Sequence, residues 1–201
     1  MSIETLDTRG KILQAAIDIV GLKGEVTIRE ITEKAGANVA SINYHFGNKN
    51  NLLKEVESYY SGILYDRQCK MLEDNHLTSS EKLVNWTKSF IDFLFEYPSL
   101  FGLIGALSIE DKDYKPRIIE KIYLNKELQN IIIEIIKRAT GIIDEKTLNY
   151  KYLQLFSGIV GIVVSRIVSN TFGNGDSIFD IDNREAIDEY ANILIKGVLS
   201  N

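Results

Sequence analysis

The stretch that decides the fold is Thr27–Leu53, TIREITEKAGANVASINYHFGNKNNLL. Its first four residues form a capping box, in which the Thr27 hydroxyl and the Glu30 carboxylate accept hydrogen bonds from free backbone N–H groups at a helix start. Gly36 tolerates positive φ, and Asn38 is able to cap a new helix. The stretch therefore predicts a helix-turn-helix, with two short helices separated by a turn of about three residues.

The second helix of this motif, residues 39–46, has two different faces. At about 100° per residue, Val39, Ile42 and Phe46 fall within one arc. A helix this short is unstable alone, so we expect that arc to pack against the preceding helices. The other face is free and carries small or polar side chains: Ala40, Ser41, Asn43 and Tyr44.

The apolar periodicity on either side of the motif predicts more helices. One begins at Asp7 or Thr8 and ends at Gly21 or Gly24, and a long one runs from Lys49 to about Asp74. Others are predicted over residues 79–96, 98–110, 115–139, 144–171 and 182–199, separated by Pro98, Pro116, Gly141 and a turn at Gly173–Gly175. We expect an all-α protein of about nine helices, with a three-helix domain over residues 1–48 and a larger domain over 49–201.

The composition is that of a globular chain, since 45% of the 201 residues are hydrophobic and 25% are charged. The opening residues lack the apolar core of a signal peptide, and the apolar run from Leu155 to Val164 is too short to span a bilayer. The single cysteine, Cys69, cannot form an intramolecular disulfide, and we interpret it as incidental rather than as a redox sensor. We expect a cytoplasmic protein.

Three groups of residues in and after the motif are characteristic when they occur together. They are Ala35-Gly36 at the turn, Tyr44-His45-Phe46 at the end of the second helix, and Lys49 and Leu52 after it. With them, the Thr27–Leu53 stretch resembles the DNA-binding segment of the TetR (tetracycline repressor-like) family of regulators. The resemblance implies a homodimeric, ligand-binding transcription regulator. It also implies a repressor, which a small-molecule effector releases from a palindromic operator.

The resemblance assigns roles to the helix-turn-helix. Ala40, Ser41 and Asn43 would face the major groove, whereas Thr27, Tyr44, His45 and Lys49 would hold backbone phosphates, and Arg29 would serve either role. The family more often has Tyr at the position of Asn43. From the residues alone, the helix N-termini at Thr27 and Asn38 offer backbone N–H groups to phosphates. The predicted DNA-binding residues are Thr27, Arg29, Asn38, Ala40, Ser41, Asn43, Tyr44, His45 and Lys49.

The distribution of charged residues indicates which DNA sequences the motif would bind and how. The net charge is −5, and residues 1–60 hold seven Lys/Arg against eight Asp/Glu, which counts mildly against DNA binding. No Arg or Lys on the free face can pair with guanine, so we expect A·T-rich sites, with Asn43 on adenine, Ala40 on a thymine methyl and Arg29 on any guanine. With few charged contacts, two linked subunits reading half-sites about one helical turn apart become necessary.

The larger domain contains a dense set of aromatic residues, some of which are expected to line an effector cavity. Packing in the core is the alternative for each of them. By resemblance to the family, Phe156 would join them from a later helix, and the effector would be largely apolar or aromatic. The predicted ligand-binding residues are Trp86, Phe90, Phe93, Tyr97, Phe101 and Phe156.

Three small residues, Gly158, Gly161 and Ser165, lie on one side of an apolar helix, where they allow another helix to approach closely. The resemblance places the dimer interface in helices 144–171 and 182–199, so that two subunits would form a four-helix contact. Packing within one chain is the alternative.

The sequence gives little support to other functions. We find no nucleophile with a base and no paired carboxylates that indicate an enzyme. His76 has no ligand set at metal-binding spacing, so we assign no metal and no cofactor. The near alternative is a transcriptional activator of the same family. More distant alternatives are a helical protein-interaction module and a small helical enzyme.

Overall fold

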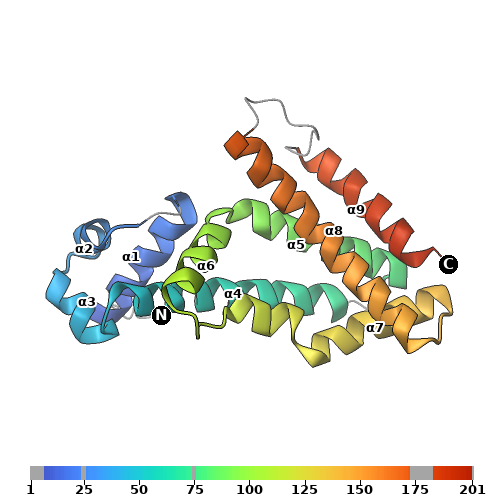
Figure 1. Ribbon diagram of the computed structural model, residues 1–201, viewed down its shortest axis with the longest axis horizontal. Helices are drawn as coiled ribbons and strands as arrows, with labels where there is room; N and C mark the ends of the chain where they lie inside the picture. The colour runs from blue at the N-terminus through green and yellow to red at the C-terminus, as the bar shows by residue number, and fades with distance from the viewer. Residues whose placement is uncertain (1–6, 24–25, 74–75, 173–182, 201) are drawn as a thin grey trace. The chain divides into compact units, whose positions relative to one another are not determined.

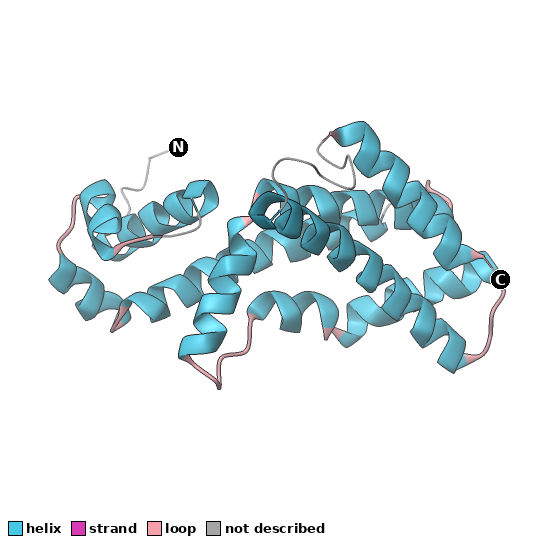
Figure 2. Cartoon of the chain, turned by 45° about the horizontal axis from the view of Figure 1, so that its top comes forward, coloured by secondary structure: helices cyan, strands magenta, loops and turns pink. Residues whose placement is uncertain are grey.

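The computed structural model describes residues 7–23, 26–73, 76–172 and 183–200, and all regular secondary structure in these ranges is helical (Figure 2). The all-α prediction is therefore confirmed. The predicted turn at Gly173–Gly175 lies outside the described residues. The elements are α1 (Thr8–Lys23), α2 (Ile28–Ala35), α3 (Val39–Phe46), α4 (Lys49–Glu73), α5 (Ser79–Glu96), α6 (Ser99–Glu110), a π-helical segment η1 (Ile119–Tyr123), α7 (Lys126–Thr140), α8 (Glu145–Phe172) and α9 (Arg184–Leu199).

The prediction of one continuous helix over residues 115–139 is wrong. The structure has two elements there, η1 and α7, with Leu124 and Asn125 between them. Asn125 has extended backbone, and its side-chain oxygen accepts hydrogen bonds from the backbone N–H groups of Glu127 at 3.0 Å and Leu128 at 3.1 Å. This N-cap starts a new helix, which the apolar periodicity did not reveal because it continues across the break.

The chain packs as two units, and α4 contributes residues to both. The first unit comprises Met1–Ile63 and Glu96–Lys121, and the second comprises Leu64–Phe95 and Ile122–Asn201. This is a division by packing. The predicted division at residue 48 concerns which residues bind DNA, and it stays a prediction.

In the first unit, α1, α2 and α3 pack on one another, and α6 packs on α1 (Figure 1). Ile12, Ile31 and Ile42, one from each of the first three helices, are fully buried. Two hydroxyl groups fasten later helices to α1. Tyr60 of α4 donates to the Ile17 carbonyl at 2.9 Å, and Ser99 of α6 donates to the Val20 carbonyl at 2.6 Å. The short helices of this unit are thus held by a shared core.

In the second unit, α8 packs against both α7 and α9. Its core includes Trp86 of α5, Ile132 of α7 and Leu155 of α8, all fully buried. None of the described helices is, by itself, long and apolar enough to cross a membrane.

Candidate nucleic-acid interface

The helix-turn-helix forms as the sequence predicts. The backbone N–H of Glu30 donates to the Thr27 hydroxyl oxygen at 3.2 Å, and the backbone N–H of Thr27 donates to the Glu30 carboxylate at 2.9 Å, so the capping box is complete. Gly36 ends α2 in the left-handed conformation, with φ 62°. The Asn38 side-chain oxygen then accepts from the backbone N–H of Ser41 at 2.9 Å and starts α3.

The two faces of α3 differ in exposure. Ile42 and Phe46 are buried, whereas Ala40 and Asn43 are exposed and 85% of Tyr44 is exposed. The prediction that Val39 belongs to the packed arc is wrong, because 49% of its surface is exposed. Val39 is the first residue of α3 and lies at the edge of the arc, so only the later turn of the helix is held in the core.

Arg9 of α1 holds the end of α3, which the sequence analysis missed. Its guanidinium donates to both carboxylate oxygens of Glu55 at 2.7 Å and lies 4.8 Å from the centre of the Phe46 ring. One side chain thus joins α1, α3 and α4. Arg9 and Glu55 are 46 positions apart, and no local pattern could have paired them.

The two predicted DNA contacts at α2, Thr27 and Arg29, already have partners in the protein. The Thr27 hydroxyl donates to the Glu30 carboxylate at 2.9 Å, so a phosphate would compete with that bond. Arg29 forms an ion pair with Glu33 at 2.9 Å. The Arg29 and Glu33 side chains are 86% and 63% exposed, and such a pair contributes only about 0–1 kcal/mol, so Arg29 can leave it for DNA.

Three predicted contacts, Tyr44, His45 and Lys49, lie at or just after the end of α3. The rings of Tyr44 and His45 meet edge to face with their centres 4.9 Å apart. Gly47 follows with φ 79°, and the Asn51 side chain donates to the Phe46 carbonyl at 3.0 Å. This hydrogen bond joins the start of α4, whose first residue is Lys49, to the end of α3.

The structure divides the predicted ligand-binding residues between the two units. Trp86, Phe90 and Phe156 form a buried cluster in the second unit, with ring centres 5.5–5.9 Å apart. Phe93 of the same unit is fully buried, and the Arg67 guanidinium lies 5.4 Å from its ring centre. Tyr97 and Phe101 belong to the first unit, where the Tyr97 ring lies 4.6 Å from that of Tyr60.

Two tyrosines extend the cluster of the second unit, and the sequence analysis did not single them out. The rings of Tyr123 and Tyr152 lie 5.2 and 4.8 Å from that of Phe156. The Tyr152 hydroxyl donates to the Tyr123 carbonyl at 3.1 Å, and burial raises the pKa of Tyr152 above its ordinary value. Their positions, about 30 residues apart on different elements, gave no shared helical pattern.

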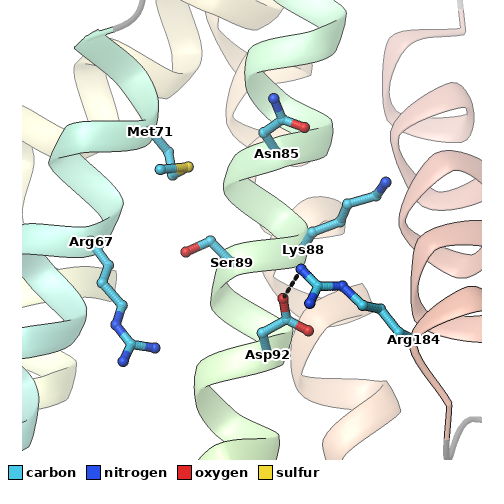
Figure 3. A pocket seen from close by; sticks show the side chains of 7 residues that line it. All are labelled: Arg67, Met71, Asn85, Lys88, Ser89, Asp92 and Arg184. Carbon is cyan, nitrogen blue, oxygen red and sulfur yellow. Dashed lines mark ion pairs between the residues drawn. The ribbon is translucent and has the colours of Figure 1, made fainter.

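A polar groove of about 310 Å³ lies in the second unit (Figure 3). It includes two ion-pairing cations: Lys88 lies 3.1 Å from Asp188, and Arg184 lies 3.9 Å from Asp92. The groove is therefore different in chemistry from the buried aromatic cluster. The lining residues are Arg67 and Met71 of α4, Asn85, Lys88, Ser89 and Asp92 of α5, and Arg184 of α9.

The three residues of the predicted dimer seam have different surroundings. A Cβ atom at Gly158 would lie 2.5 Å from a methyl carbon of Leu194, so Gly158 serves the packing of α8 on α9 within the chain. A Cβ atom at Gly161 would meet no neighbouring element within 4 Å in the described part of the chain, and Ser165 is half-buried. Gly161 belongs to an exposed apolar face of α8, which also includes Leu153, Val160, Val164 and Val168, each 44–49% exposed.

Among the described residues, no group of three or more His, Cys, Asp and Glu side chains lies close enough together to hold a metal ion.

Comparisons with known proteins agree with this geometry. Residues 12–56 match the family model of bacterial regulatory proteins, tetR family. This range runs from the buried core of α1 through α2 and α3 into α4. A search of curated proteins gives no match.

Solved structures match the chain over nearly its whole length. A protein of unknown function from Rhodococcus sp. RHA1 has a TM-score of 0.70 at 14% identity, with 100% of each chain covered. The TetR family transcriptional regulator PfmR from Thermus thermophilus has a TM-score of 0.62 at 18% identity, covering 92% of this chain and 97% of its own. A TetR family transcription regulator from Marinobacter aquaeolei VT8 has a TM-score of 0.60 at 17% identity, with 94% of each chain covered.

The fold and the helix-turn-helix resemble those of DNA-binding transcriptional regulators of the all-helical class. Residues 12–56, which include the helix-turn-helix, are similar to the tetR family of bacterial regulatory proteins, and the chain shares its fold with solved structures of TetR family regulators.

Proposed function

We propose that this protein is a homodimeric repressor that binds a palindromic operator and leaves it when a small-molecule effector binds. The observation that carries the proposal is the exposed polar face of α3 within a helix-turn-helix of the family's type. On this face Asn43 and Ala40 read base edges, and Tyr44, His45 and Lys49 hold phosphates. Thr27, Arg29, Asn38 and Ser41 complete the contacts.

Two subunits are needed because α3 has no basic residue on its exposed face, so one subunit gains little from phosphate charges. The exposed valines of α8 and Ile193 of α9, which is 63% exposed, offer an apolar surface for a second copy of the chain. When one helix-turn-helix of a dimer binds its half-site, the second is held at a high effective concentration near the other half-site, so the dimer binds more tightly than either subunit alone. We therefore place the dimer interface on α8 and α9, with Gly161 in the contact and Gly158 outside it.

Effector release requires a route from the second unit to α3, and α4 offers one because it contributes residues to both units. In the first unit, the buried Glu57 carboxylate accepts from the backbone N–H groups of Arg117 at 3.1 Å and Ile118 at 2.8 Å. Lys54 adds an ion pair to Asp111 at 2.7 Å. Residues 111–118 thus bind the half of α4 that follows α3. A shift of α4 would change the orientation of α3.

The effector site lies in the aromatic cluster of the second unit, around Trp86, Phe90 and Phe156. Phe93, also on α5, is fully buried in the same unit. Tyr97 and Phe101, which belong to the first unit, act in its packing. The dimer has one conformation in which its two α3 helices fit adjacent major grooves and another in which they do not. An effector that binds the second conformation more tightly lowers operator affinity, by a factor set by its difference in affinity for the two conformations.

The proposal is tested by binding of labelled duplex DNA at a series of salt concentrations. We expect the logarithm of the binding constant to fall linearly with the logarithm of salt concentration, and Lys49→Ala to reduce that slope by about one, the value for a single phosphate contact. Lys137→Ala, an exposed lysine on α7, is the matched control and should leave the slope unchanged. A chain that binds no duplex at any salt concentration would instead be a protein-interaction module.

A further inference from the structure

Three side chains in the second unit are fully buried and polar: Gln68, Trp86 and Thr87. Among the described residues, no hydrogen-bond partner exists for Gln68 Nε2, Gln68 Oε1, Trp86 Nε1 or Thr87 Oγ1. Buried polar atoms in proteins are nearly always hydrogen-bonded, because an unbonded one loses its water without compensation. Four such atoms on two neighbouring helices therefore indicate that a bound molecule supplies their hydrogen bonds.

Gln68 and Trp86 lie at the same level of α4 and α5. The Lys82 ammonium donates to the Leu72 carbonyl at 3.2 Å, so the end of α4 lies beside the start of α5. Gln68 is four residues before Leu72, and Trp86 is four residues after Lys82. Both residues are therefore the same distance along their helices from the Lys82–Leu72 contact. Since Leu64 and Leu72 are also buried, Gln68 occupies the middle of the core-facing stripe of α4.

An aromatic wall adjoins these polar atoms. The Trp86 ring meets those of Phe90 and Phe156 edge to face, and Tyr123 and Tyr152 extend the wall beyond Phe156. Among the described residues of this unit, no buried side chain carries a charge. A charged ligand group would find no buried counterion there, so the surroundings favour a neutral ligand.

The polar groove of Figure 3 is lined by residues of the same two helices, α4 and α5, together with Arg184 of α9. Met71 of α4 and Ser89 of α5 line it, and they are three residues from Gln68 and Trp86 respectively. Residues three apart are neighbours on a helix surface. The groove therefore lies within one helical turn of the buried pair on both α4 and α5.

We propose that Gln68 and Trp86 are the polar end of the effector site, and that they bind a neutral, mostly apolar amide. The Trp86 N–H and the Gln68 NH2 donate to the amide carbonyl, and the Gln68 carbonyl accepts from the amide N–H. The apolar body of the ligand packs on the aromatic wall. This inference rests on the proposed function for the role of the ligand, and it adds the chemical class of that ligand.

The test measures the melting temperature of the whole protein with 2-phenylacetamide and with propylbenzene, an apolar molecule of similar size. Wild type should be stabilised more by the amide than by the hydrocarbon. Gln68→Leu removes two unbonded atoms, and it should raise the melting temperature of the ligand-free protein by about 2–4 °C. It should also abolish the preference for the amide, and Trp86→Phe should weaken that preference.

The matched control is Gln129→Leu on α7, whose side chain already accepts from Lys126 at 3.0 Å. It should not raise the melting temperature and should keep the amide preference. A fall in the melting temperature of Gln68→Leu would mean that water or another group satisfies Gln68, and would overturn the proposal. So would an equal or absent response of wild type to the two compounds. Because the readout is thermal, failure of DNA binding would leave this result unaffected.

Discussion

Two helices of this protein expose very different surfaces. The exposed face of α3 consists of small or hydrogen-bonding side chains, such as Ala40, Asn43 and Tyr44. The exposed face of α8 is a row of valines, 44–49% exposed, that includes Val160, Val164 and Val168. Hydrogen-bonding groups match the base edges and phosphates of DNA, whereas an exposed apolar row matches another protein surface. In the proposed function, DNA binding and dimer formation therefore use separate helices.

The two helices are also held differently. The eight-residue α3 depends on its Asn38 cap, two buried side chains and the Arg9 contact with Phe46. The 28-residue α8 packs along α9, where Gly158 permits close contact with Leu194. Substitutions on the exposed face of α8 should therefore act on assembly, and those around α3 should act on DNA contact.

The largest expected effect comes from Gly161→Trp. Within the described part of the chain, no atom of a neighbouring element lies within 4 Å of where a Cβ atom at Gly161 would stand, so a bulky residue meets only a partner. We expect monomers in sedimentation and a loss of operator affinity of about 100-fold or more, because the avidity of two heads disappears. Gly105→Trp, at an equally open glycine of α6, is the control. Unchanged dimers would reject the assignment of this face.

The next effect is that of Asn43→Ala. Loss of a bidentate contact with adenine costs about 1–3 kcal/mol of discrimination, so the preference for adenine at one operator position should fall by about 5- to 150-fold. Asn130→Ala, an exposed asparagine on α7, provides the matched control. Competition binding with operators changed at single positions measures the effect. Equal loss of affinity for every operator would reassign Asn43 to phosphate contact.

A smaller effect is expected from Asn38→Ala, which removes the cap of α3. Such caps contribute about 1 kcal/mol, so the free energy of unfolding should fall by that amount and operator affinity should fall with it. Asn125→Ala removes the corresponding cap of α7. Chemical denaturation should show similar losses for both variants, whereas DNA binding should weaken for Asn38→Ala alone.

The smallest effect concerns pH and the contact between α1 and α2. Burial opposes ionisation of Asp18, but hydrogen bonds from Lys34 and Gln14 outweigh it and lower the pKa of Asp18 below its ordinary value of 3.8. A lowered folded-state pKa gives stability that is present above 3.8 and is lost as the pH falls through the folded-state value. Asp18→Asn should flatten this acid limb in pH-dependent denaturation, and Asp66→Asn should retain it.

Local signals predicted the helix-turn-helix well. The Thr27 cap, the Gly36 turn and the Asn38 cap each act within four residues, so the sequence alone displays them. The break at Asn125 is local too, but a continuing apolar period concealed it. Val39 was wrongly predicted to be buried. A helical wheel shows which residues share a face, but not how far along the helix its neighbours cover that face.

Contacts between distant residues could not be predicted in the same way. The Arg9–Glu55 pair and the Glu57 hydrogen bonds to residues 117 and 118 depend on how the helices meet in space. The aromatic residues looked like one set along the chain, but they fall into two packing units. Gly158 and Gly161 looked equivalent on a helical wheel, and only the packing of Leu194 separates them.

The most direct test of the central claim is selection of binding sites from random duplex DNA by the wild-type protein. The account predicts palindromic sites with A·T-rich half-sites about one helical turn apart, and a relaxed preference at one adenine when Asn43→Ala is used. G·C-rich half-sites that are insensitive to Asn43→Ala would contradict it.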